Sequence, residues 1–103
     1  MYIFFGDDIA EKLKENYLVL ELEEIESDNK KARAYCVVPA DKISLAELPN
    51  IPKYRVLHSE LVNRYEQGDY DFCRIALVNL MGKFGGEVDS FYQELESKIT
   101  HTA

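Results

Sequence analysis

Side chains that commonly bind metals are scarce in this 103-residue chain, which contains two cysteines and two histidines. A structural zinc site needs about four such ligands, and neither residue type shows the close paired spacing of zinc ligands. A zinc site is therefore not expected. Carboxylates could still bind Mg²⁺ or Ca²⁺, but Asp69, Asp71, Glu87 and Asp89 all fall at predicted helix starts, which favours a capping role. We therefore expect no metal and no cofactor. Cys36 and Cys73 each lie within an apolar run, so both are predicted to be small buried side chains with reduced thiols.

Basic residues are outnumbered, because 12 lysines and arginines stand against 19 aspartates and glutamates, giving a net charge of −7. Binding to a nucleic-acid backbone or to an anionic membrane needs a basic surplus. Neither is therefore an expected partner. Residues 1–31 alone carry nine acids and four bases. Such an acidic region either keeps the protein soluble or docks a basic partner.

Long apolar runs are also missing. No segment reaches the length of a transmembrane helix, and Asp7 and Asp8 interrupt the apolar start of the chain, unlike a secretory signal. A cytoplasmic location is therefore expected. Tryptophan is absent, but seven tyrosines and five phenylalanines can fill one modest core. The length predicts a single domain covering residues 1–103.

The first 39 residues predict a small three-stranded sheet with one short helix. The apolar run at 2–5 and the alternating apolar residues at 17–26 and 32–38 are typical of strands. Asp7 is expected to cap a helix at 8–15. If the first two strands are adjacent and parallel, the crossover between them should be right-handed.

A hairpin with its turn at Asp28 and Asn29 should join the second and third strands. The glutamates of the second strand could suggest a catalytic or metal site, but we interpret them as a solvated face that pairs with basic residues across the hairpin. The residues concerned are Glu21, Glu23 and Glu24, facing Lys30, Lys31 and Arg33.

The rest of the chain predicts a connector at 39–52 and then about three helices. Leu45, Leu48 and Ile51 of the connector are expected to pack into the core. Helical spacing begins at Lys53 and ends at Gly68. The complete pattern therefore predicts an α+β fold, with a small sheet first and helices after it.

Two more helices follow. Asp69 or Asp71 should cap the first of them, which runs to about Gly82, and an amphipathic helix covers 87–99. The glycine-rich segment 82–86 between them lacks the pattern and the preceding strand of a phosphate-binding loop. We interpret it as a helix end and a turn.

The helix at 72–81 is apolar around almost its whole circumference. Such a helix is either surrounded by its own chain or partly covered by a second subunit. A homodimer is expected, because it would cover this helix and the edges of the small sheet. The interface candidates are Tyr70, Phe72, Leu77 and Met81.

Four residues could line a ligand-binding or catalytic pocket between sheet and helices. They are His58, Tyr65, Cys73 and Asn79. His58 has nucleophile and carboxylate candidates in the chain, but no spacing signature selects one. We therefore favour a buried, hydrogen-bonded histidine and no catalytic residues, with a small enzyme or ligand-binding protein as the alternative.

Two segments resemble known sequences. Residues 65–77, YEQGDYDFCRIAL, resemble the middle of a tetratricopeptide unit, but no second copy follows, and an array needs several. The pairing of GDYDFC (68–73) with MGKFGGEVDSFY (81–92) resembles small uncharacterised proteins of tailed phages of marine bacteria. This second resemblance implies a phage or bacterial setting and assigns no functional residue.

The function expected from these features is a non-catalytic module that binds another protein. The acidic composition, the many tyrosines and phenylalanines, and the lack of a site motif favour this interpretation. In a phage setting, the partner would be a host protein with a basic surface. A weaker alternative is an acidic mimic of nucleic acid, with carboxylates spaced like phosphates along one face.

Overall fold

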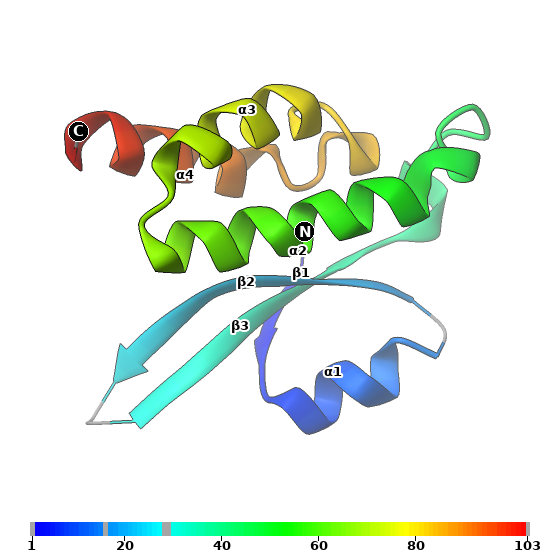
Figure 1. Cartoon of the computed structure of the whole chain (residues 1–103). Helices are drawn as coiled ribbons and strands as arrows, with labels where there is room; N and C mark the ends of the chain where they lie inside the picture. Colours follow the sequence, from blue (N-terminus) through cyan, green and yellow to red (C-terminus); the bar gives the residue numbers. More distant parts are fainter. Residues whose placement is uncertain (1, 16, 28–29, 103) are drawn as a thin grey trace.

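The computed structural model of the protein describes residues 2–15, 17–27 and 30–102, which form an α+β fold (Figure 1). Within these residues there are three strands, four α-helices and three short 3-10 turns. The strands and α-helices are β1 (Tyr2–Phe5), α1 (Asp7–Leu13), β2 (Leu18–Ser27), β3 (Lys30–Val38), α2 (Ile51–Gln67), α3 (Tyr70–Leu80) and α4 (Asp89–Thr102). The predicted fold class is confirmed, while the predicted turn at Asp28 and Asn29 lies outside the described residues.

The sheet has the strand order β1-β3-β2, and both outer strands run antiparallel to β3. Cys36 in the central strand lies opposite Ile3 of β1 and Leu20 of β2. The first two strands are therefore parallel but not adjacent. The right-handed crossover was expected only for adjacent parallel strands, so that expectation does not apply. The hairpin pairs β2 with β3 locally and leaves the second edge of β3 for β1.

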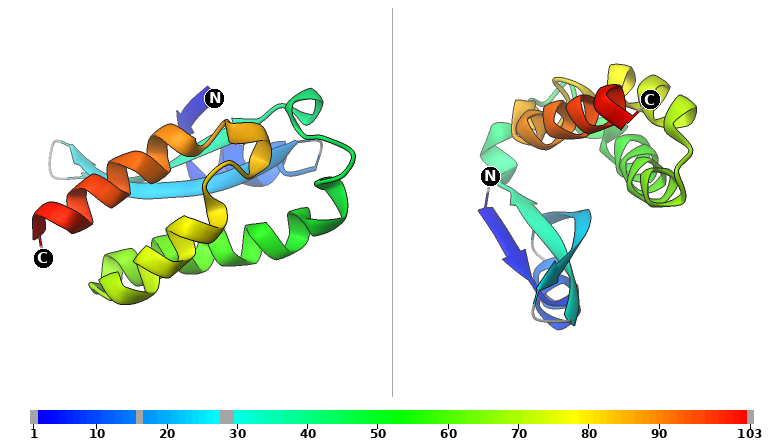
Figure 2. Two further views of the ribbon diagram at one scale, coloured as in Figure 1. Left: turned by 90° about the horizontal axis from the view of Figure 1, so that it is seen from above. Right: turned by 90° about the vertical axis from the view of Figure 1, so that its left-hand side faces the viewer.

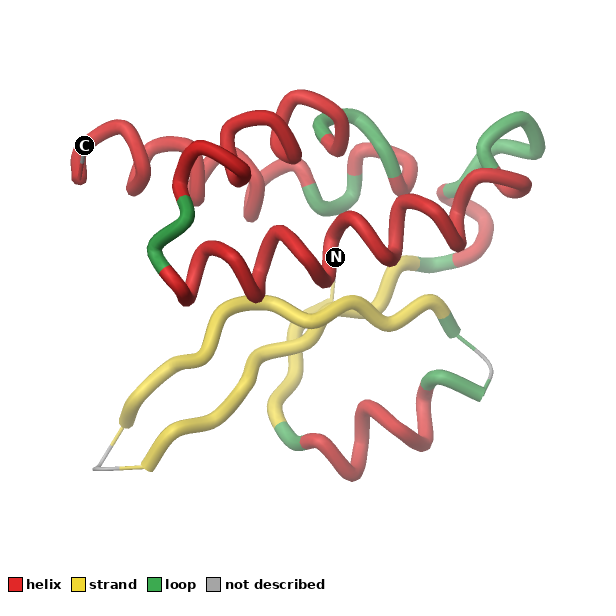
Figure 3. The backbone as a smooth tube through the Cα atoms, viewed as in Figure 1, coloured by secondary structure: helices red, strands yellow, loops and turns green. Residues whose placement is uncertain are grey.

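The elements form layers. Helices α2, α3 and α4 cover one face of the sheet, and α1 lies on the other side (Figures 1 and 3). Figure 2 shows these layers from two further directions. The core lies between the sheet and the three helices. Alternate β3 residues Ala34, Cys36 and Val38 are buried there, as predicted. The predicted apolar face of the last helix is also buried: Val88, Phe91, Tyr92, Leu95 and Ile99.

The junction of α2 and α3 follows the sequence prediction. Gly68 ends α2 in a left-handed conformation with φ 84°, and its N–H donates to the carbonyls of Arg64 and Tyr65. Asp69 then caps α3, because its Oδ1 accepts a hydrogen bond from the N–H of Phe72 at 3.4 Å. A glycine C-cap followed at once by an aspartate N-cap fixes the sharp reversal between the two helices.

The predicted cap of α1 is wrong. Gly6, not Asp7, occupies the N-cap position, and its φ of 114° is one that residues with a side chain rarely adopt. Asp7 is instead the first residue of the helix, where the helix dipole favours an acid. Its carboxylate accepts a short hydrogen bond from the hydroxyl of Tyr35 on β3, which ties the start of α1 to the sheet.

The connector packs less deeply than predicted. Leu45 and Leu48 are 84% and 47% exposed, whereas Ile51 packs against the core as expected. A polar contact holds the segment instead. The carboxylate of Glu47 accepts hydrogen bonds from the N–H groups of Phe84 and Gly85, at 2.7 and 3.3 Å. With this anchor in place, the two leucines need not enter the core.

Candidate interaction surfaces

His58 is a buried core residue. Its Nε2 lies 2.5 Å from the backbone carbonyl of Glu21, and its Nδ1 lies 2.8 Å from the hydroxyl of Tyr92. A carbonyl can only accept, so Nε2 carries the proton and Nδ1 accepts from the tyrosine. Burial lowers the pKa of this histidine. The neutral ring therefore bridges β2, α2 and α4, as predicted for a hydrogen-bonded histidine.

The other three pocket candidates do not form a common site with His58. The Sγ of Cys73 lies 3.7 Å from the carbonyl of Leu61 in the core. Tyr65 is half-buried against the ring of Tyr70. Asn79 is exposed, and its Nδ2 donates to the carbonyl of Ile75 one turn earlier in its own helix. Each candidate thus has a local structural partner, and the four do not converge on one hollow.

The two cysteines are poor nucleophiles in this environment. Both are free thiols buried in the core. Burial raises the pKa of Cys36 to about 12. Burial also raises the pKa of Cys73. Because the thiolate is the reactive form, neither thiol is prepared for attack on a substrate.

The negative charge is concentrated on one side of the molecule. Residues 7–27, which form α1 and β2, contain eight acids and two bases. These two elements lie beside each other, with α1 on the side of the sheet away from α2, α3 and α4 (Figure 1). Asp8, Glu11 and Glu15 are exposed there. We call α1 together with β2 the acidic side.

A polar hollow of about 390 Å³ lies within the acidic side, between the start of α1 and the hairpin. Asp7, Glu21 and Glu24 contribute carboxylates to it, and Lys31 and Arg33 contribute basic groups. Arg33 lies 3.6 Å from Glu24. Burial and the neighbouring Asp7 raise the pKa of Tyr35, which also lines it, to about 12. The hollow therefore combines three acids with two bases beside a neutral aromatic ring.

The predicted ion pairs across the hairpin are confirmed in part. Arg33 lies 3.6 Å from Glu24 on β2, but a shorter contact of 2.6 Å joins it to Glu66 on α2. Glu23 pairs with Lys98 on α4 at 2.9 Å. Glu23 thus faces the helices and not the basic residues of the hairpin. The pairing of β2 with β3 is irregular between Glu21 and Glu24, and an extra residue at such a place turns the side chains there to the other face of the sheet.

The outer surface of α3 carries large apolar side chains that the described part of the chain leaves exposed. Ile75 and Val78 are 67% and 79% exposed, and Val56 on the adjacent α2 is 71% exposed. A hollow of about 560 Å³ separates α2 from α3, with Val56 and Val78 in its walls. The helix is therefore not surrounded by the described part of the chain. We call Val56, Ile75 and Val78 the apolar ridge.

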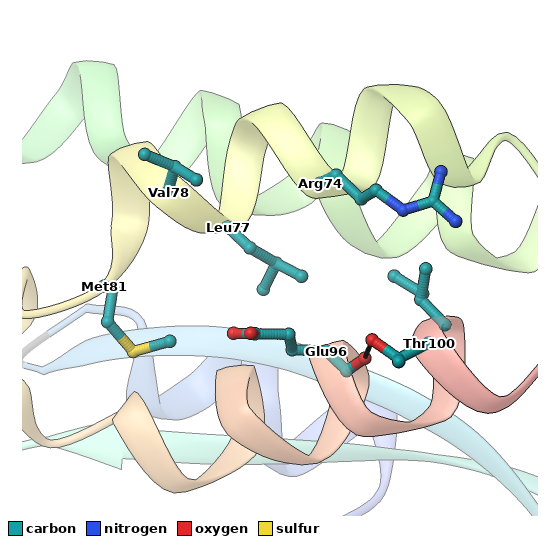
Figure 4. Close-up of a pocket in the computed structure, with 7 residues that line it drawn as sticks. Arg74, Leu77, Val78, Met81, Glu96 and Thr100 are labelled. Atoms are coloured by element: carbon teal, nitrogen blue, oxygen red, sulfur yellow. Dashed lines mark hydrogen bonds between the residues drawn. The ribbon is translucent and has the colours of Figure 1, made fainter.

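Another hollow beside α3, of about 520 Å³, lies between α3 and α4 (Figure 4). Leu77, Val78 and Met81 line it from α3 and the segment that follows, and Glu96 and Thr100 line it from α4. Of the predicted interface residues, Leu77 and Met81 line this hollow, whereas the rings of Tyr70 and Phe72 contact Tyr65 and Arg64 on α2. Leu77 is buried, whereas Tyr70, Phe72 and Met81 are partly buried against the core.

Sequence reasoning missed the three residues of the apolar ridge as surface candidates. Ile75 is four residues after the exposed Asp71, and Val78 is three residues after Ile75. This spacing places Asp71, Ile75 and Val78 on one face of α3. That spacing was visible in the sequence. Which apolar face of α3 meets the core was not, because almost the whole circumference of the helix is apolar.

The glycine-rich turn at 82–86 binds an anion from its own chain. Phe84 and Gly85 have φ of 55° and 66°, and their adjacent N–H groups point at the Glu47 carboxylate. Successive N–H groups in this kind of turn form a small anion-binding nest. Glu47 fills it, which agrees with the predicted structural role of the segment.

Among the residues the structure describes, no group of three or more His, Cys, Asp or Glu side chains is placed to hold a metal ion. No helix in that part of the chain is long and apolar enough to cross a bilayer. No protein-family model, curated protein or solved structure matches the chain.

Proposed function

We propose that the protein is a non-catalytic interaction module whose acidic side binds a basic surface of another protein. The observation that carries this proposal is the concentration of eight acids and two bases in residues 7–27, which form two adjacent elements. Opposed charge patches steer partners together and exclude wrong ones. The exposed carboxylates of Asp8, Glu11 and Glu15 are accessible to a partner lysine or arginine.

The source of the partner follows from the resemblance to phage proteins. In a phage setting, this module is made inside a bacterial cell and acts on a host protein. A basic patch on that host protein is the feature that the acidic side recognises. If the target is a nucleic-acid-binding protein, the module competes with nucleic acid for the same patch.

The test is affinity capture from a bacterial lysate at low and at moderate salt, comparing the wild type with a variant of α1 and the turn that follows it. The variant carries Asp8→Asn, Glu11→Gln and Glu15→Gln, which remove three exposed charges without touching the core. We expect the wild type to retain a protein with a basic patch, less of it at moderate salt, and the variant to lose most of it.

A matched control distinguishes an effect of the acidic side from an effect of the total net charge. Asp41→Asn, Glu94→Gln and Glu96→Gln also remove three exposed acids, but from the connector and α4. The control should retain the partner as well as the wild type does. Equal loss in both variants, or no partner at either salt concentration, contradicts the proposal.

A further inference from the structure

The apolar ridge lies next to a surface whose charges are nearly balanced. Residues 51–83, which include α2 and α3, contain four acids and five bases, so the excess negative charge lies elsewhere in the chain. Helix α1 of the acidic side lies beyond the sheet from α2 and α3 (Figure 1). Two copies of the chain can therefore meet at α2 and α3 while their α1 helices point away from each other.

Two lysines and an exposed aspartate lie at opposite ends of this surface. Lys53 and Lys83 lie at one end of the hollow between α2 and α3, where the Nζ of Lys83 is 5.4 Å from the ring centre of Tyr54. Asp71 stands in the first turn of α3, towards the other end, with its side chain 96% exposed and its Oδ1 2.8 Å from Nη1 of Arg74 in the same chain. The apolar ridge lies between the two lysines and this ion pair.

We infer that the apolar ridge binds a second copy of this chain, with the two α3 helices antiparallel about a two-fold axis. In this arrangement, α3 of each copy lies over the hollow between α2 and α3 of the other. Ile75 of one copy then packs beside Val78 of the other, and the same contact is repeated by symmetry. A parallel arrangement would separate Lys83 of each copy from Asp71 of the other and so lacks this contact between opposite charges.

Spacing along the helix supports this register. Asp71 lies about 8 Å from the point midway between Ile75 and Val78, at roughly 1.5 Å per residue. Leu80 lies about 5 Å beyond that midpoint on the same scale. The N–H of Lys83 donates to the Leu80 carbonyl at 3.0 Å, so Lys83 stays near the end of α3. Its long side chain can therefore reach Asp71 of the other copy.

The self-complementary charges allow a test by exchange. Asp71→Lys places two lysines together at both ends of the pair, and Lys83→Asp places two acids together at both ends. Each variant alone should self-associate at least about tenfold more weakly than the wild type. Mixed in equal amounts, the two variants should associate with each other, because every facing pair then has opposite charges.

The readout is mass by sedimentation equilibrium over roughly a hundredfold range of concentration. The wild type should rise from the monomer mass of 11.9 kDa towards twice that value. Val78→Lys should remain monomeric, since it puts a charge at the centre of the apolar contact. Unchanged thermal unfolding of each variant at low concentration confirms that the fold is intact.

A control on the sheet edge identifies the surface. Ile3 on the edge strand β1 is also exposed, at 56%, so Ile3→Lys should leave the dimer intact. A wild type that is monomeric at all concentrations, a dimer that survives Val78→Lys but not Ile3→Lys, or charge variants that fail to associate when mixed would each overturn the inference.

Discussion

The Nδ1 of His58 on α2 lies 2.8 Å from the hydroxyl of Tyr92 on α4, and both side chains are fully buried. The other ring nitrogen donates to the carbonyl of Glu21 on β2. One imidazole thus satisfies polar groups from a strand and a helix inside the core. Buried polar groups of this kind are costly to leave unpaired, so the contact holds these elements in one arrangement.

Removing the tyrosine hydroxyl should destabilise the fold. Tyr92→Phe leaves Nδ1 of His58 buried without a donor, and we expect a loss of about 1–3 kcal/mol in the free energy of unfolding. Tyr17→Phe, at a site that is 55% exposed, should change it by less than about 0.5 kcal/mol. Urea denaturation of the two variants measures both values. A similar effect of the two substitutions would show that the bridge contributes little.

Stability should depend on pH through His58. Burial lowers its folded-state pKa below the ordinary value of 6.5, so the unfolded chain takes up the proton first as the pH falls. The neutral ring therefore contributes its full stabilisation of the fold above about pH 6.5, and this stabilisation decreases as the pH falls below 6.5. Urea midpoints between about pH 8 and pH 5 measure this slope. In a His58→Gln variant the slope should be shallower, and an equal slope would exclude His58 as the cause.

The glycine-rich turn provides a test of close packing. A Cβ on Gly85 would lie 2.0 Å from the carbonyl oxygen of Lys42, whereas a Cβ on Gly82 would meet nothing within 4 Å. Both glycines have positive φ, so Gly82→Ala measures the backbone cost alone, about 1–2 kcal/mol. Gly85→Ala should cost roughly a further 1–3 kcal/mol because the connector must move. Equal losses in chemical denaturation would mean that the connector yields without cost.

The cysteines should resist modification in the folded protein. Burial raises the pKa of Cys36 to about 12 and also raises that of Cys73, so little thiolate is present at neutral pH. A coloured thiol reagent should therefore react slowly with the native protein and fast with both thiols in denaturant. Fast reaction of either thiol in the native state would contradict the burial of that side chain.

The sequence predicted most of the architecture because local signals agree with one another. Gly68 and Asp69 punctuate the helices as expected, and the alternation of Ala34, Cys36 and Val38 marks the buried face of β3. Strand order was not predictable in this way. The hairpin leaves one free edge on β2 and one on β3, and no local pattern encodes which of them pairs with β1.

The surfaces were harder to predict than the elements. The exposure of Ile75 and Val78 depends on the direction from which α2 and α4 approach α3, and an all-apolar helix does not show it. The role of Glu47 was invisible for a related reason, since its contact with Gly85 spans 38 residues. The acidic side, in contrast, follows from the sequence once α1 and β2 are known to be neighbours.

The most direct test of the proposed function is amide hydrogen exchange of the protein alone and with the basic partner recovered by affinity capture. Binding through the acidic side predicts slower exchange within residues 7–27, with the amides of α4 unchanged. Protection confined to α3 or α4, with residues 7–27 exchanging as in the free protein, would contradict it.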